Sequence, residues 1–67
     1  GNDKACEEQC LAIIKKEPAF APAWNNLALA YFDQGEHAKA KEAAETAKKL
    51  GFEVPEGFLE ELKENTD

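Results

Sequence analysis

A stripe of large apolar side chains, followed by a stripe of small ones, most constrains the fold of this chain. The large stripe comprises Trp24, Leu27, Ala28 and Tyr31. Their spacing of three and four residues places them on one face of a helix. Beyond Gly35, the small stripe comprises Ala40, Ala44 and Ala47. Rings that face alanines across a short turn predict two antiparallel helices in close contact.

Start and stop signals divide the chain into four predicted helices. Asn2 or Asp3 caps the first helix, and Pro18 ends it. Pro22 suits the first turn of the second helix, where its missing N–H costs nothing. Gly51 suits a left-handed cap after the third. The predicted helices run from Asn2 or Asp3 to Lys16, Pro22 to Gln34, Ala38 to Leu50, and Pro55 to Asn65.

The two outer helices have apolar stripes of different strength. The first has a stripe of Cys6, Cys10 and Ile13, with Ile14 beside it. The apolar edge of the fourth comprises Phe58, Leu59 and Leu62, and the rest of that helix is acidic through Glu56, Glu60, Glu61 and Glu64. One apolar and one charged face are typical of a helix that caps a stack of repeats.

The central segment resembles a tetratricopeptide repeat, whose pattern is Trp-x2-Leu-Gly-x2-Tyr, then Ala-x3-Phe, then Pro. The matching residues are Trp24, Leu27, Tyr31 and Ala40. Ala28 replaces the glycine, Ala44 replaces the aromatic residue, and Phe52 replaces the closing proline. The resemblance implies an all-α fold of antiparallel helix hairpins in a right-handed superhelical stack of about four helices.

The family's 34-residue period extends the resemblance to the whole chain. A shift by one period overlays Cys6 on Ala40 and Cys10 on Ala44, and it places Phe58 on Trp24 but Glu61 on Leu27. The implied organisation is a single domain over residues 1–67. Residues 1–20 would be the second half of a preceding repeat, 21–54 a full repeat, and 55–67 a capping helix.

The charge balance constrains the class of partner. Fourteen acidic residues and eight basic ones, all lysines, give a net charge of −6. Phosphate binding requires the opposite sign, so we expect neither nucleic acid nor membrane as partner, and a basic protein or peptide is favoured. We recognise no signal peptide and no membrane-spanning run. Gly1 in place of an initiator methionine suggests a cleaved chain, from which any targeting segment would be missing, and we expect a cytoplasmic location.

The resemblance also implies a binding groove on the second helix. In similar proteins, one side of the first helix of each repeat lines a groove that holds a partner peptide. The corresponding residues here are Pro22, Asn25, Leu29, Phe32 and Asp33. Leu29 and Phe32 would make apolar contacts, and Asn25 would bond to peptide backbone. The alternative is that Leu29 and Phe32 pack against the first or fourth helix.

Other binding chemistry has little support in the sequence. Asn26 matches an asparagine that some repeats use to hold a carboxylate, but residues 21–34 contain no Lys or Arg. Cys6, Cys10 and His37 could supply three zinc ligands, but the chain contains no fourth Cys or His to complete a site. A disulfide within one helix is geometrically poor. We therefore expect reduced, buried thiols, no metal and no cofactor.

The chain also lacks a recognisable set of catalytic residues. It contains no serine and no Gly-rich phosphate loop, and its carboxylates are scattered over predicted solvent faces. We therefore expect a module that binds proteins and not an enzyme.

Self-association is the alternative function. The first helix lacks the helix that would precede it in a complete repeat, so its flank of Leu11, Ala12 and Ile14 would be exposed. A second copy of the chain would cover Leu11 and Ile14 and give a homodimer.

Overall fold

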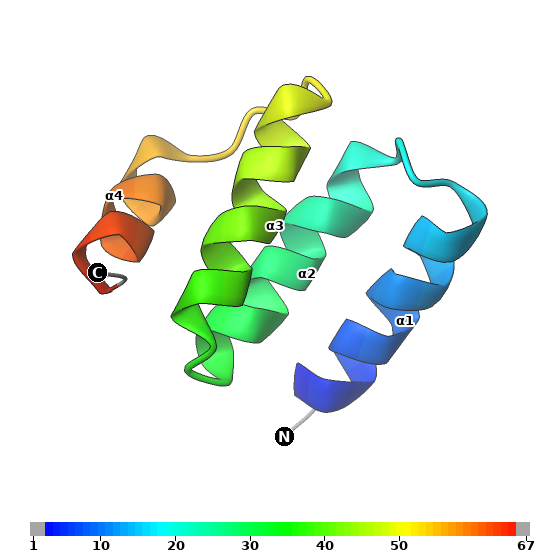
Figure 1. The fold of residues 1–67 in the computed structure, drawn as a ribbon, viewed down its shortest axis with the longest axis horizontal. Coiled ribbons are helices and arrows are strands. Elements are labelled where there is room, and N and C mark those ends of the chain that lie inside the picture. Colours follow the sequence, from blue (N-terminus) through cyan, green and yellow to red (C-terminus); the bar gives the residue numbers. More distant parts are fainter. Residues whose placement is uncertain (1–2, 66–67) are drawn as a thin grey trace.

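The computed structural model describes residues 3–65, which form four α-helices joined by short loops (Figure 1). The helices are α1 (Asp3–Lys16), α2 (Ala21–Asp33), α3 (His37–Lys49) and α4 (Glu56–Asn65). The helix α2 packs between α1 and α3, and α4 packs against α3. No strand occurs within residues 3–65. The all-α prediction is confirmed, and each predicted helix lies within one residue of its expected limits.

Two glycines end the central helices as their positions predicted. Gly35 has a φ of 81° and Gly51 a φ of 97°, a left-handed conformation that side chains disfavour. After α2, the Glu36 amide donates to the Tyr31 carbonyl at 2.9 Å, and the Gly35 amide donates to Phe32 at 3.0 Å. Gly51 and the residue after it repeat this pattern at the end of α3. These caps turn the chain sharply enough for neighbouring helices to run antiparallel.

The core lies where α2 meets α3 and α1. Leu27 is 2 % exposed, and the alanines that surround it on α2 and α3 are buried. The buried core residues of these helices are Leu27, Ala28, Ala40, Ala43, Ala44 and Ala47. Trp24 and Tyr31 pack against them and are partly buried. The predicted packing of large side chains against alanines is therefore present.

The apolar stripe of α1 was predicted wrongly at one position. Cys10 is buried, and Cys6 and Ile14 pack against the core. Ile13, which was predicted to belong to the stripe, is 40 % exposed. The stripe advances by four residues at each step, and Ile13 lies to one side of it, turned away from α2. In α3 the corresponding residue, Ala47, faces α2 and is fully buried.

The helix α4 contacts the rest of the fold through one edge. Leu62 is fully buried, Phe58 and Leu59 are partly buried, and the four glutamates of the helix are exposed. This matches the apolar edge expected from the sequence. None of the four described helices combines the length and the apolar composition needed to cross a membrane.

Candidate functional site

The residues expected to line a groove on α2 do not share one environment. Pro22, Leu29 and Asp33 are exposed, and Leu29 has 44 % of its surface accessible. They lie seven and four residues apart, so they form one line along the solvent face of the helix. Every other apolar side chain within α2 apart from Pro22 is buried or partly buried. Leu29 therefore stands out as an accessible apolar residue on a helix that is otherwise packed.

Asn25 lies one turn before Leu29 on the same edge of α2. Its side-chain oxygen Oδ1 is buried and accepts no hydrogen bond. A buried polar atom without a partner destabilises a fold by about 1–3 kcal/mol. In a native structure each such atom calls for an explanation, such as a bound water, an ion or another molecule.

Phe32 differs from Leu29 because its ring is partly buried and packs against other aromatic rings. Its ring lies 5.1 Å from the ring of His37 and 5.5 Å from that of Phe58, with an edge-to-face angle of 77° to Phe58. These contacts join α2 to the start of α3 and to α4. For Phe32 the structure therefore favours the packing alternative, whereas Leu29 remains accessible.

The residues considered for self-association on α1 are also divided. Leu11 is 41 % exposed, and Ala12 is exposed. Ile14 packs against the core beside Cys10, so little of it is left for a second copy. Ile13 takes its place as the accessible isoleucine of α1.

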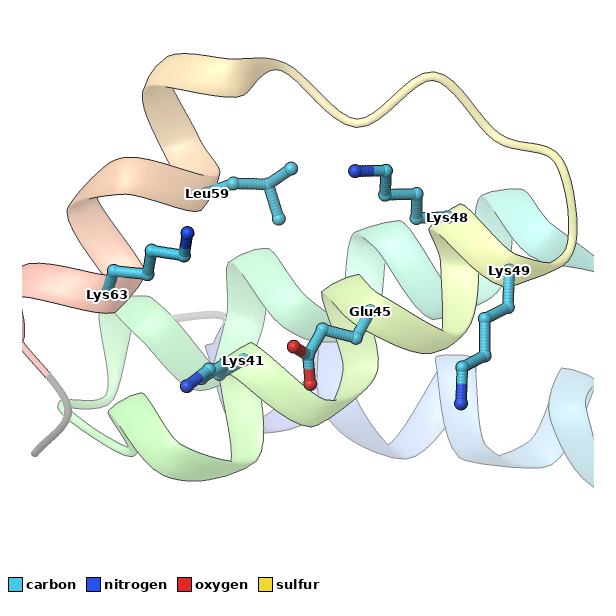
Figure 2. Close-up of a pocket in the computed structure, with 6 residues that line it drawn as sticks. All are labelled: Lys41, Glu45, Lys48, Lys49, Leu59 and Lys63. Atoms are coloured by element: carbon cyan, nitrogen blue, oxygen red, sulfur yellow. The ribbon is translucent and has the colours of Figure 1, made fainter.

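A groove between α3 and α4 was missed by the sequence reasoning. Its lining residues are Lys41, Glu45, Lys48, Lys49, Leu59 and Lys63. Figure 2 shows Leu59 and Lys63 on α4, and Lys48 reaching from α3 toward that helix. The net charge of the chain hid this basic patch. The signal in the sequence was the spacing of Lys41, Glu45 and Lys48, which puts them on one face of α3.

Two side chains on α1 have altered acidity. Burial, with the Cys6 thiol beside it, raises the pKa of the Cys10 thiol to about 11, so Cys10 stays protonated at neutral pH. The Gln34 side-chain amide donates to Glu7 Oε1 at 2.9 Å. That hydrogen bond and the nearby Lys4 ammonium lower the pKa of Glu7.

Potential metal ligands are not gathered in one place. Within residues 3–65, no three His, Cys, Asp or Glu side chains come together in a group that could hold a metal ion. Both cysteines are free thiols. The His37 ring packs on Phe32.

Comparison with known proteins gives one match. The tetratricopeptide repeat family model matches residues 21–50, which include α2, the Gly35 turn and α3. No curated protein matches the chain. No solved structure matches it either.

Proposed function

Because residues 21–50 form a tetratricopeptide repeat, we propose that this chain is a protein–protein interaction module that binds a partner segment along the exposed face of α2. Repeats of this family generally act as non-catalytic scaffolds for protein binding. The observation that carries the proposal is the pair formed by Asn25 and Leu29. An unpaired amide oxygen lies one turn from a large accessible apolar side chain on the same helix edge.

The proposed contacts follow from the chemistry of each side chain. Leu29 receives an apolar side chain of the partner, with Pro22 extending the surface toward the start of α2. The Asn25 amide rotates to bond with partner backbone, which removes the penalty of its unpaired oxygen. Phe32 supports this face through its ring contacts with His37 and Phe58 and does not itself touch the partner.

Charge favours a basic partner segment at this face. Asp33 is exposed at the end of α2, and residues 21–34 contain no Lys or Arg. The chain as a whole carries a charge of −6, which attracts basic segments from a distance at low salt. A lysine or arginine of the partner beside Asp33 would fix the direction of the bound segment.

Peptides selected from a random display library on the whole chain would test the proposal. Leu29→Ala should weaken binding of the selected peptides about tenfold, as expected for loss of a central apolar contact. Leu11→Ala is the matched control, because Leu11 has a similar exposed fraction on another helix. Equal binding by Leu29→Ala and the unmodified chain would refute the proposal.

Self-association is a second candidate, favoured by the exposure of Leu11 and Ile13 on α1. Two exposed large apolar residues on one short helix offer a contact surface to a second copy. Sedimentation equilibrium over a wide range of concentrations in reducing buffer tests it. A dimer that Leu11→Glu abolishes would support it, and a monomer at every concentration would rule it out.

A further inference from the structure

The groove between α3 and α4 carries a charge opposite to that of the chain. Four of the eight basic residues of the protein line it, together with a single glutamate. The chain nevertheless has a net charge of −6. The positive charge is therefore concentrated at one place, on a surface distinct from the exposed face of α2.

The lysines of the groove have no partners of their own within residues 3–65. The ion pairs found there are Lys4 with Glu7, at 3.6 Å, and Lys39 with Glu36, at 3.2 Å. Neither pair belongs to the groove. Glu45 lies among the groove lysines without forming an ion pair with any of them. Ammonium groups without a partner are available to attract an anion that binds in the groove.

The groove is also large and partly apolar. Its volume is about 620 Å³. Leu59 projects into it from α4 and is partly buried, and Lys41 is partly buried on the opposite wall (Figure 2). The long lysine stems add further apolar lining, because only their ends are charged. An anion that carries an apolar side chain therefore fits the groove better than a small inorganic ion.

One end of the groove is acidic. A neighbouring recess includes Lys48 and Leu59 but also Glu53 and Glu56, which lie at the start of α4 and before it. The positive surface therefore extends from Lys48 toward Lys63 and no further. A long polyanion such as nucleic acid would meet these glutamates, and the chain has no arginine to grip phosphates in pairs.

We propose that the groove between α3 and α4 binds a short acidic segment of a partner protein. The carboxylates of that segment lie near Lys41, Lys48 and Lys63, and one of its apolar side chains packs on Leu59. This surface is separate from the α2 face, so the chain can hold two segments of opposite charge at once. The proposal does not depend on binding at α2.

Chemical-shift mapping on the ¹⁵N-labelled chain tests the proposal, with a short blocked peptide of glutamates around one central leucine as the probe. Shifts should be confined to amides near Lys41, Lys48, Leu59 and Lys63. Lys48→Gln together with Lys49→Gln should weaken binding about tenfold, as the loss of two exposed charges implies. Binding should also weaken as salt is raised from about 50 to 200 mM, because salt screens exposed charges.

The matched control is Lys15→Gln together with Lys16→Gln. These two lysines close the last turn of α1 as Lys48 and Lys49 close that of α3, and removing them changes the net charge equally. The control should bind the probe as the unmodified chain does. Equal weakening by both pairs would mean that net charge alone attracts the peptide, and the proposal would fail.

Two further arms exclude other occupants of the groove. Lys41→Gln with Lys63→Gln leaves the end of α3 intact and should also weaken binding, so a folding defect at that end cannot mimic the result. The glutamate peptide without its leucine, and inorganic phosphate, should bind at least several-fold more weakly. Equal binding of phosphate, or a dimer that Lys48→Gln with Lys49→Gln dissociates, would overturn the proposal. The Leu29→Ala variant should bind the acidic probe normally, which separates this site from that on α2.

Discussion

The helix pairs α1–α2 and α3–α4 align when the sequence is shifted by 34 residues, yet α1–α2 is closely packed and α3–α4 leaves a groove between its helices. A shift of 34 residues relates Leu11 to Glu45 and Ile14 to Lys48. In the first pair, Ile14 and Cys10 pack against the core, and hydrogen bonds tie both ends of the helices together. In the second pair, Lys48 stands at the position of Ile14 and lines a groove, whereas Ala44, at the position of Cys10, stays buried.

The cause of this difference lies in both helices of the second pair. The residues of α4 that correspond to Leu27 and Ala30 are Glu61 and Glu64. Docking α4 as α2 docks on α1 would bury these carboxylates at a high cost in desolvation. Instead α4 packs against the core along one edge, through Leu62, Phe58 and Leu59. The comparison teaches that positions related by the 34-residue shift can be buried in one helix pair and line an open groove in the other.

The largest expected effect is at Leu27, in the closed region. Leu27→Ala should lower the free energy of unfolding by about 3 kcal/mol, because it leaves a cavity where α1, α2 and α3 meet. A domain of this size has a total stability of about 3–10 kcal/mol, so at least about a third of it would be lost. Urea unfolding followed by circular dichroism measures this. A loss below about 1 kcal/mol would contradict the central role of this contact.

Leu62→Ala sharpens the comparison in the open region. It should cost about 2 kcal/mol, at the low end for a buried leucine, because α4 can detach while the other helices stay folded. Hydrogen exchange should quicken in α4, and Trp24 fluorescence should change little. A cooperative loss of all four helices would instead show that α4 is as integral to the fold as α1.

Exchanging the corresponding residues tests the comparison directly. Lys48→Ile should raise stability by about 1 kcal/mol, since it adds apolar surface against Leu59. Ile14→Lys should lower stability by about 1–2 kcal/mol, because it opens the seam between α1 and α2. Chemical denaturation of both variants measures the two changes. The same sign for both would refute the proposed equivalence.

The smallest effect concerns Glu7 and Gln34. The hydrogen bond from Gln34 lowers the pKa of Glu7 in the folded chain, so Glu7 favours folding above its usual pKa and loses this contribution as the pH falls through the lowered value. Gln34→Ala should raise the pKa of Glu7 toward its usual value. Carbon-detected NMR titration measures it, and Gln9→Ala, an exposed glutamine on α1, is the control.

The sequence predicted the elements well because their signals are local. The stripe from Trp24 to Tyr31, the two left-handed glycines and the prolines near helix starts each act over a few residues. The site was harder to predict. Leu29 and Phe32 have the same apolar character in the sequence, and only the tertiary position of Phe58 and His37 distinguishes the packed residue from the accessible one.

The errors also have physical causes. The apolar spacing of three and four residues placed Ile13 in the stripe of α1, but Ile14 continues the four-residue steps and packs against the core. The basic groove escaped notice because a net charge of −6 describes the sum and not the distribution. The walls of the groove come from two helices, α3 and α4. The side of α4 that faces α3 is the one that leaves Glu61 and Glu64 exposed.

The most direct test of the account is a pair of chemical-shift maps on the same labelled chain, one with a basic peptide selected on the chain and one with the acidic probe. The account predicts two separate sets of shifted amides. The basic peptide should shift those around Asn25, Leu29 and Asp33, and the acidic probe those around Lys48, Leu59 and Lys63. If both peptides shifted the same amides, or neither shifted any, the assignment of two binding surfaces of opposite charge would be wrong.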